Sequence, residues 1–201
     1  MTLALGDAAP SFSLKGVDGK VHSLEDYADA AVLVLVQSCV HCPYVQASEE
    51  HLKETQALYA AKGVKLVAIN SNSAELQPED SFDEMVAHAK AQQFNFDFLH
   101  DETQAVARAL YGTRTPEVFV FDRERRLRYH GAPLSALLDH RSANDGDGSD
   151  SDSTVRSYLR EALDAVLAGQ APVTTETPLL GCSVKSDDLI LLRDPIRFEW
   201  Q

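Results

Sequence analysis

Apolar residues follow two kinds of pattern along this chain, and each kind predicts a type of secondary structure. Unbroken runs rich in Val, Leu and Ile are typical of strands that are buried on both faces of a sheet. Such runs occur at residues 31–37, 64–70 and 117–122, and shorter runs that predict strands occupy residues 96–100 and 127–130. Apolar residues three, four or seven positions apart are typical of amphipathic helices. Helices are predicted over residues 43–62, 82–89, 102–111 and 154–168.

The order of these elements, in which strands and helices alternate until a final pair of strands, predicts the fold class. It is typical of an α/β sandwich with a mixed sheet, in which the first strands are parallel and the last are antiparallel. A length of 201 residues fits one large domain. We expect a single domain over residues 1–183, with an acidic flexible loop at 139–153, followed by an irregular tail at 184–201.

Charge and hydropathy argue against several classes of partner. The chain has 18 basic and 31 acidic side chains, which give a formal net charge of −13. Surfaces that carry phosphate repel such a protein on average, so we expect neither a nucleic-acid nor a membrane partner. The longest apolar run covers only residues 30–36, whereas a membrane-spanning helix needs about 20 residues. The first residues have no secretory signal pattern, and we expect a cytoplasmic protein.

The chain has three cysteines, which are too few for a disulfide framework. Cys39 and Cys42 form a C-x-x-C pair, and Cys182 is remote from them in the sequence. Such a pair indicates a zinc site or a dithiol redox centre, and two buried free cysteines are the third alternative. A zinc site needs two further ligands with typical spacing, and the chain has no second C-x-x-C and no H-x₃₋₅-H pair. We therefore expect no metal, and no cofactor other than a Cys39–Cys42 disulfide.

The C-x-x-C pair lies where a buried strand is expected to end and a helix to begin. Backbone N–H groups and the helix dipole stabilise a thiolate at such a position, so we expect Cys39 to have a lowered pKa and to act as the nucleophile. Cys42 follows by about one helical turn and is within reach to resolve a mixed disulfide. His41 either lowers the pKa of the neighbouring thiol further or faces solvent without a partner.

The sequence Cys39-Val-His-Cys42-Pro-Tyr-Val is similar to the active-site motif of redoxin-type thioredoxin-like proteins, a group related to AhpC/TSA proteins and TlpA-like thiol-disulfide oxidoreductases. The resemblance covers about residues 3–183. It includes the segments 6–14, 18–24, 68–72, 80–82, 101–104, 115–122 and 181–185. It implies a thioredoxin-like fold, with a mixed central sheet flanked by helices and an N-terminal β-hairpin.

The resemblance also implies roles for residues outside the C-x-x-C motif. In the Thr115-Pro116 pair, Pro116 is expected to be a cis proline that faces the dithiol and presents the Thr115 backbone to an extended substrate chain. Leu33 stands where thioredoxin-like reductases carry a buried acid. Arg114 stands where close relatives often have a third cysteine, and it either adds positive charge near the dithiol or faces solvent. Cys182 lies in a Gly-Cys tail and is either a further resolving thiol or a packed side chain.

These observations predict a thiol-disulfide oxidoreductase in which Cys39 attacks and Cys42 resolves. We expect its partners to be protein or small-molecule disulfides and thiols, together with a thiol electron donor, and homodimer formation is left open. A thiol-dependent peroxidase is the main alternative, because the N-terminal hairpin is shared with peroxiredoxins. In neither cysteine register, however, does the chain match the peroxidase motif P-x-x-x-[TS]-x-x-C. A non-enzymatic thioredoxin-like binding module is the third alternative, and the intact C-x-x-C pair argues against it.

Overall fold

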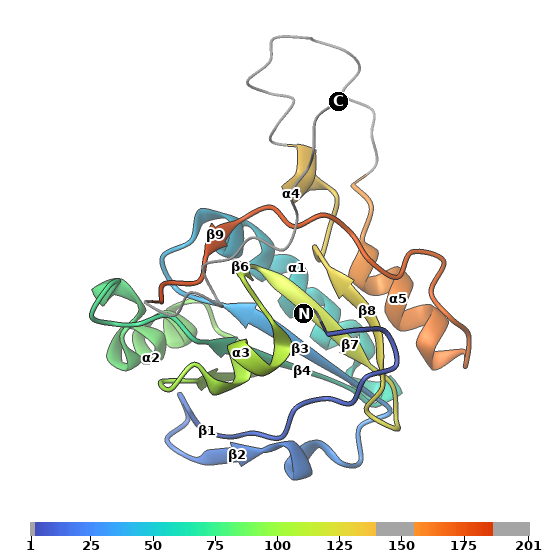
Figure 1. The fold of residues 1–201 in the computed structure, drawn as a ribbon, viewed down its shortest axis with the longest axis horizontal. Helices are drawn as coiled ribbons and strands as arrows, with labels where there is room; N and C mark the ends of the chain where they lie inside the picture. The colour runs from blue at the N-terminus through green and yellow to red at the C-terminus, as the bar shows by residue number, and fades with distance from the viewer. Residues whose placement is uncertain (1–2, 140–154, 187–201) are drawn as a thin grey trace, which may run out of the picture.

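A computed structural model describes residues 3–139 and 155–186 of the chain, and its elements follow the predicted order (Figure 1). The strands of the main sheet are β1 (Ser13–Gly16), β2 (Val21–Ser23), β3 (Val32–Ser38), β4 (Val64–Asn70), β5 (Asp97–His100), β7 (Glu117–Phe121) and β8 (Leu127–Gly131). A second, small sheet consists of β6 (Arg114–Thr115) and β9 (Cys182–Ser183). The helices are α1 (Pro43–Tyr59), α2 (Phe82–Ala91), α3 (Ala105–Leu110), α4 (Ala136–Asp139) and α5 (Tyr158–Leu167), with 3₁₀ turns η1 (Leu24–Tyr27), η2 (Ala60–Lys62) and η3 (Pro78–Asp80).

The main sheet has the strand order β2-β1-β5-β4-β3-β7-β8. The central strands β3, β4 and β5 are parallel, whereas β7 pairs antiparallel with β3, and β8 pairs antiparallel with β7. The predicted mixed sheet, with parallel strands first and antiparallel strands last, is therefore confirmed. β1 and β2 form the predicted N-terminal hairpin, which joins the sheet where β1 pairs antiparallel with β5.

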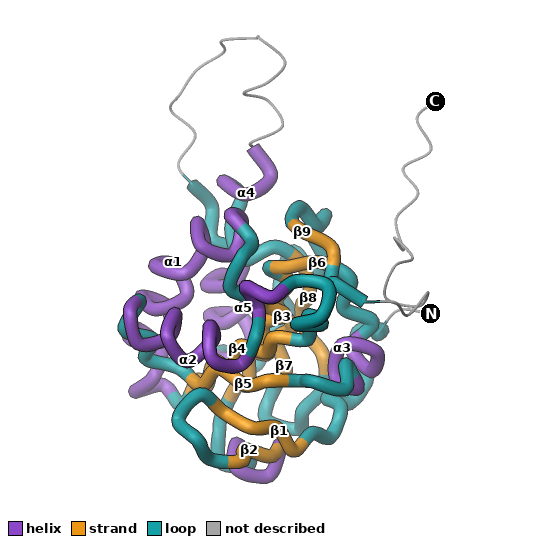
Figure 2. Tube along the Cα trace, turned by 90° about the vertical axis from the view of Figure 1, so that its left-hand side faces the viewer, coloured by secondary structure: helices purple, strands orange, loops and turns teal. Residues whose placement is uncertain are grey.

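Helices cover both faces of this sheet, and α3 lies on the face opposite to α1, α2 and α5 (Figure 2). On one face, Val34 and Val36 of β3 belong to the apolar core beneath α1, α2 and α5. On the other face, Leu33 and Leu35 belong to the core shared with α3 and the N-terminal segment. Because both faces are buried, β3 needs apolar residues at successive positions, which explains its unbroken apolar run.

The end of β3 leads directly into the segment that carries the cysteine pair. β3 pairs with β4 in register from Val32 opposite Val64 to Ser38 opposite Asn70, so the two strands end at the same edge of the sheet. α1 then begins at Pro43, a residue favoured at the first position of a helix because its missing N–H would have no partner there. The strand and helix predicted on either side of the cysteines are therefore confirmed.

The small sheet and the residues after it differ from what the sequence predicts. The apolar pattern does not predict the pairing of β6 with β9, because strands of two residues are too short to show a period. Residues 184–186, which we expected in the irregular tail, lie against the protein, and the Ser73 N–H donates to the Lys185 carbonyl at 2.9 Å. The acidic loop expected at 139–153 lies outside the described residues except for Asp139, and so does the tail beyond residue 186.

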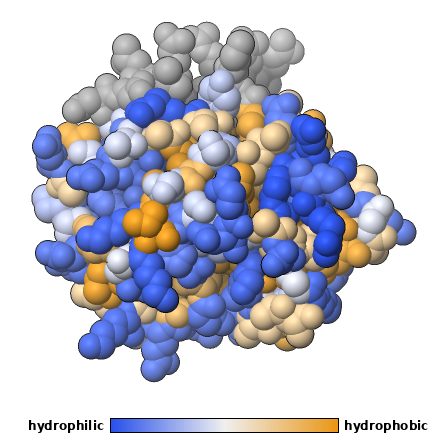
Figure 3. Space-filling view, turned by 90° about the horizontal axis from the view of Figure 1, so that it is seen from below, coloured by the Kyte–Doolittle hydropathy of each residue, from blue (hydrophilic) through white to orange (hydrophobic). Residues whose placement is uncertain are grey.

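In the parts of the chain that the structure describes, no helix is long and apolar enough to cross a membrane. Figure 3 views the molecule from below, the side on which the β1–β2 hairpin lies. Hydrophilic residues cover most of this face, and apolar residues form small separate patches between them. Small separate patches of this kind are ordinary for protein surfaces and do not by themselves indicate a docking site.

Candidate active site

The loop between β3 and α1 brings the two cysteines to the same residue, Thr115. Cys39 follows the last residue of β3, and Cys42 is the N-cap residue of α1. The Cys39 Sγ lies 3.5 Å from the Thr115 Oγ1, and the Cys42 Sγ lies 3.3 Å from the Thr115 carbonyl oxygen. The Thr115–Pro116 peptide bond is cis, as the resemblance implied. The residues predicted from the C-x-x-C motif and from the Thr-Pro pair therefore meet at one place.

Both cysteines of the pair are buried: Cys39 is 1% exposed and Cys42 is 0% exposed. They form a small apolar cluster with Val45 of α1, and the partly buried side chains of Tyr44 and Cys182 pack against this cluster. Exposure therefore does not distinguish the two cysteines. Their hydrogen-bond partners do.

Hydrogen bonds shift the pKa values of the two thiols in opposite directions. The neighbouring side chain of Cys39 does most to lower the pKa of Cys42; burial opposes this, and the side chain of Cys182 and the N–H groups of Val45 and Cys182 add to the lowering. The hydrogen bond to Cys42, burial and the nearby Asp80 carboxylate raise the pKa of Cys39. We expected the lowered pKa at Cys39. In this pair it falls on Cys42 instead, chiefly because of the neighbouring Cys39 side chain, with smaller contributions from Cys182 and from the Val45 N–H of α1.

A fully buried carboxylate, Asp80, holds the loop between the two cysteines. Its Oδ1 accepts hydrogen bonds from the N–H groups of Val40 at 2.7 Å and His41 at 3.1 Å. Its Oδ2 accepts a hydrogen bond from Asn72 Nδ2 at 2.6 Å and lies 2.5 Å from His41 Nδ1. Asn70 Nδ2 donates to the Asp80 carbonyl at 2.9 Å. These contacts tie the cysteine loop to the end of β4.

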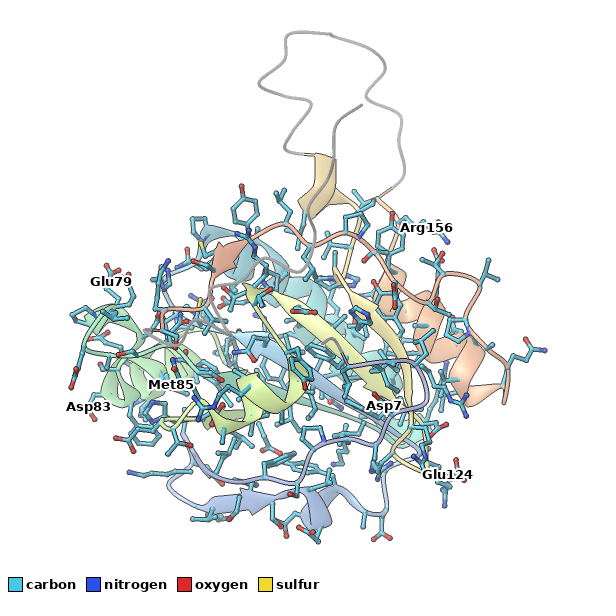
Figure 4. The ribbon with its side chains drawn as sticks, in the orientation of Figure 1. Asp7, Glu79, Asp83, Met85, Glu124 and Arg156 are labelled. Carbon is cyan, nitrogen blue, oxygen red and sulfur yellow. The ribbon has the colours of Figure 1, made fainter. Side chains whose placement is uncertain are left out.

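His41 has a partner within the protein, so the alternative of a solvent-facing histidine without a partner is wrong, and an effect of His41 on the thiol pKa stays a prediction. Its side chain is only 12% exposed and forms an ion pair with Asp80 when the imidazole is protonated. Two neighbouring acids make no contact of this kind with His41, because the side chains of Glu79 and Asp83 point away from the protein into solvent (Figure 4). His41 therefore belongs to the hydrogen-bonded support of the loop.

Cys39, His41 and Asp80 are also the group of described residues whose positions could hold a metal ion. One potential ligand atom from each of them lies within 4.8 Å of the other two. In the structure, Asp80 and His41 already bond to each other, and Asp80 also binds the loop backbone. These bonds fill the role that an ion would have, and the absence of a metal remains a prediction.

Three further residues were singled out in the sequence: Arg114, Cys182 and Leu33. The Nη1 of Arg114 donates to the Gly181 carbonyl at 3.2 Å, so Arg114 contacts the segment that precedes Cys182. Cys182 is partly buried in β9, opposite Thr115, and touches the cysteine pair. Leu33 is fully buried in the core and contributes no acid. The buried acid of this site is Asp80, which reaches it from η3 instead of β3.

Sequence reasoning missed the function of Asp80 and Asn72, which appeared only within the family-like segments 80–82 and 68–72. One signal was available for Asn72. Asn70 and Asn72 come at the end of a predicted parallel strand, and functional residues of α/β sheets gather at the carboxyl ends of such strands. Asp80 has no comparable signal, because only the three-dimensional path of the chain after β4 brings it to the cysteine loop.

Comparison with known proteins now identifies the family. Residues 4–136 match the Redoxin family model, and the chain belongs to the redoxin family. No curated protein matches the chain. The structure is similar to that of an uncharacterized conserved protein from Geobacillus kaustophilus, with 36% identity, a TM-score of 0.79 and coverage of 92% of this chain and 94% of that one. A hypothetical protein from Sinorhizobium meliloti 1021 has 35% identity, a TM-score of 0.78 and coverage of 92% and 96%.

A less similar solved structure belongs to a protein whose name states a function. A protein from Chlorobium tepidum, assigned as the thiol:disulfide interchange protein DsbE, has 25% identity and a TM-score of 0.57, with coverage of 64% of this chain and 85% of that one. The thioredoxin-like fold that the resemblance implied is therefore confirmed. The family and this neighbour support an oxidoreductase-type enzyme that acts through thiols.

Proposed function

We propose that this protein is a thiol-disulfide oxidoreductase whose redox centre is the Cys39–Cys42 pair. One observation carries the proposal: Cys39 and Cys42 pack in one buried cluster, and both sulfurs contact Thr115. Two thiols in such contact need little movement to form a disulfide, and a Cys42 thiolate is already stabilised by N–H groups. The centre then needs no cofactor other than its own disulfide.

In the proposed reaction, Cys39 passes its proton to the Cys42 thiolate and attacks one sulfur of a substrate disulfide. A bond forms between Cys39 and that sulfur, the substrate disulfide breaks, and one substrate thiol leaves. Cys42 then attacks Cys39, which forms the Cys39–Cys42 disulfide and releases the second substrate thiol. Over the cycle the pair loses two electrons and the one proton that Cys39 first carried, which Cys42 gives up as it attacks, and the substrate leaves as one thiol and one thiolate. A thiol electron donor reverses the change in the protein.

Two features favour Cys39 as the attacking residue. Cys42 is enclosed by its hydrogen-bond donors and by the first turn of α1. Cys39 is followed by Val40 and His41, both of which are partly exposed, so its loop lies closer to the surface. A substrate sulfur can therefore approach Cys39 with a smaller displacement of the protein.

Trapping a mixed disulfide tests the proposal. In a Cys182→Ser background, the further change Cys42→Ser should leave Cys39 linked to a substrate such as oxidised glutathione, because no thiol remains to resolve it. The matched change Cys39→Ser in the same background should trap little adduct. Both proteins should lose turnover of a disulfide substrate, while circular dichroism checks that they fold. Equal trapping at Cys39 and Cys42, or full turnover by the Cys39→Ser protein, would contradict the assignment.

A further inference from the structure

Residues 181–186, which we call the covering segment, lie directly on the redox site. Within this segment β9 pairs antiparallel with β6, so that Cys182 is opposite Thr115 and Ser183 is opposite Arg114. Thr115 is the residue that contacts both sulfurs of the C-x-x-C pair. The chain itself therefore supplies an extended strand at the place where its cysteine pair meets β6.

The covering segment is bonded along both of its sides. On one side, the Val184 N–H donates to the Thr113 carbonyl at 3.0 Å. On the other side, the Lys185 N–H donates to Asn72 Oδ1 at 2.8 Å. It thus bridges the chain before β6 and the residues after β4. Both cysteines are buried, and the side chain of Cys182 packs against their cluster, so the covering segment encloses part of the redox site.

The start of the covering segment fits closely against Thr115. Gly181 has a φ of +156°, and a Cβ added to it would lie 2.1 Å from the Thr115 carbonyl oxygen. No side chain can be accommodated there without a shift of the backbone. Glycine therefore lets the segment come close enough for the next residue, Cys182, to reach the cysteine pair.

Cys182 packs against the cysteine pair. Its side chain lies against the buried cluster that contains Cys39 and Cys42, and burial and the neighbouring Cys42 raise the pKa of its thiol. A cysteine in a strand across from Thr115, with its thiol on Cys42, has the position of a substrate cysteine. Three thiols therefore lie in one connected group, although the C-x-x-C motif contains only two.

We propose that Cys182 is a third redox cysteine, which exchanges with the Cys39–Cys42 disulfide. The Cys182 thiolate attacks the Cys42 sulfur, a Cys42–Cys182 bond forms, and the Cys39–Cys42 bond breaks. Cys39 leaves as a thiolate and takes up the proton that Cys182 gave up, so the exchange involves no net oxidation. The inference rests on the proposed function, because the Cys39–Cys42 disulfide is its starting point.

This exchange has a consequence for the chemistry of the site. In the Cys42–Cys182 form, Cys39 is a free thiol in a protein that is still oxidised. It can attack a substrate disulfide, and Cys42 is not available to resolve the adduct. Such a form favours rearrangement of substrate disulfides over their reduction. It also fixes the covering segment to α1 covalently.

Two matched variants test the contact between Cys182 and Cys42. Each protein is equilibrated with oxidised glutathione, which supplies the oxidant, and its disulfides are mapped by mass spectrometry of non-reduced peptides. Cys39→Ser should form the Cys42–Cys182 link, and Cys42→Ser should form the Cys39–Cys182 link at least about tenfold less, because the Cys182 thiol interacts with Cys42 and not with Cys39. Equal yields of the two links, or glutathione adducts alone in Cys39→Ser, would overturn the proposal.

The unmodified protein provides a second measurement that does not depend on how either variant folds. After equilibration with oxidised and reduced glutathione and rapid acid quenching, a fraction of the molecules should carry the Cys42–Cys182 link, and Cys182→Ser should lack it. Finding only the Cys39–Cys42 link would overturn the exchange. A failure of the proposed function looks different, because the trapping experiment uses proteins without Cys182. If no adduct is trapped at Cys39 but the Cys42–Cys182 link forms, the assignment of Cys39 as the nucleophile is wrong, and the contact between Cys182 and Cys42 still stands.

Discussion

Asp80 is costly to bury, because a carboxylate loses its hydration inside a protein unless hydrogen bonds replace it. Here the N–H groups of Val40 and His41 and the side chain of Asn72 supply those bonds. The same negative charge disfavours a thiolate at Cys39. Asp80 therefore acts in two ways: it fixes the cysteine loop, and it keeps the proton on Cys39 until Cys42 or another base takes it.

Asp80→Asn separates these two effects. The amide keeps an oxygen for the loop N–H groups but removes the charge, so the pKa of Cys39 should fall. The measurement uses a protein in which Cys42 and Cys182 are both replaced by Ser, so that Cys39 is the remaining thiol. The rate of alkylation of Cys39 is followed as a function of pH. The midpoint of the rate profile should move to lower pH, and the free energy of unfolding should fall by about 1–3 kcal/mol because Asn72 loses its acceptor.

Asp83→Asn is the matched control for this prediction. Asp83 is close in sequence and also acidic, but it is exposed and points into solvent (Figure 4). Its replacement should leave the alkylation profile of Cys39 and the free energy of unfolding nearly unchanged, within about 0.5 kcal/mol. If both variants shift the midpoint equally, the effect comes from net charge and Asp80 has no special position.

The residues of the site differ in how far the sequence could predict them. Cys39 and Cys42 are recognisable because their spacing and their place at a strand end carry a chemical meaning. Thr115 and Pro116 were reached only through the family resemblance, because a cis bond is rare for X-Pro in general. Asp80 could not be predicted, since its contact with the loop depends on the path of the chain and not on any local pattern.

At the level of elements, the covering segment and β6 form a contact whose stability depends on a glycine. Gly181→Ala places a methyl group against the Thr115 carbonyl and should loosen the pairing of β9 with β6. We expect Cys42 to be alkylated about tenfold faster in this variant, as when local opening becomes easier by about 1.4 kcal/mol. Peptide mapping after timed alkylation of the reduced protein measures the rate.

Gly169→Ala separates the clash from the strain of an alanine at positive φ. Gly169 has a φ of +70°, and nothing lies within 4 Å of a Cβ built there. Alanine at this position pays the backbone cost without a collision. Its effect on the alkylation of Cys42 should therefore be small. Similar acceleration by both variants would mean that general loss of stability, and not opening of the covering segment, exposes the thiol.

The contact between α1 and α5 includes a histidine that is uncharged at neutral pH. His51 Nε2 lies 2.9 Å from Ser157 Oγ, and the same oxygen, at the N-cap of α5, accepts a hydrogen bond from the Arg160 N–H. The hydroxyl can donate its proton to the neutral His51 ring while its oxygen accepts from the Arg160 N–H. Burial and the positive charge of Arg160 lower the pKa of His51 to about 4.

The sign of the pH dependence follows from this lowered pKa. The unfolded chain binds a proton at His51 near pH 6.5, whereas the folded protein does so only near pH 4. The contribution of His51 to stability is therefore fully present above pH 6.5 and is lost as the pH falls toward 4. Denaturant unfolding at several pH values should show a smaller loss between pH 6.5 and 4 in His51→Gln than in the unmodified protein. Identical slopes would contradict this account.

The central strands of the main sheet were predicted because burial on both faces gives them unbroken runs of apolar residues. β4 was predicted at its observed bounds, and β3 within one residue. β6 and β9 were not predicted, since each has two residues and their pairing joins positions 114–115 to 182–183. Local sequence patterns therefore carry least information about the pairing of β6 with β9, which is the contact at the redox site.

At the scale of the whole molecule, β3 connects the two apolar layers to the redox site. Val34 and Leu35 are adjacent in β3 and fully buried, but they belong to the layers on opposite faces of the sheet. The strand ends one residue before Cys39. If the described parts of the chain form the single domain that we expect, a cavity in either layer should weaken the whole protein, the redox site included.

Leu35→Ala and Val34→Ala test this coupling from the two faces. Leu35→Ala should lower the free energy of unfolding by about 2–5 kcal/mol, and Val34→Ala by less because a smaller group is lost. Leu58→Ala, at a residue of α1 that is 59% exposed, should change it by less than about 0.5 kcal/mol. In each protein, denaturant transitions followed by far-ultraviolet circular dichroism and by thiol exposure should coincide, as for two-state unfolding. If Val34→Ala separates the two transitions and Leu35→Ala does not, the layers unfold independently, and the site depends on one of them alone.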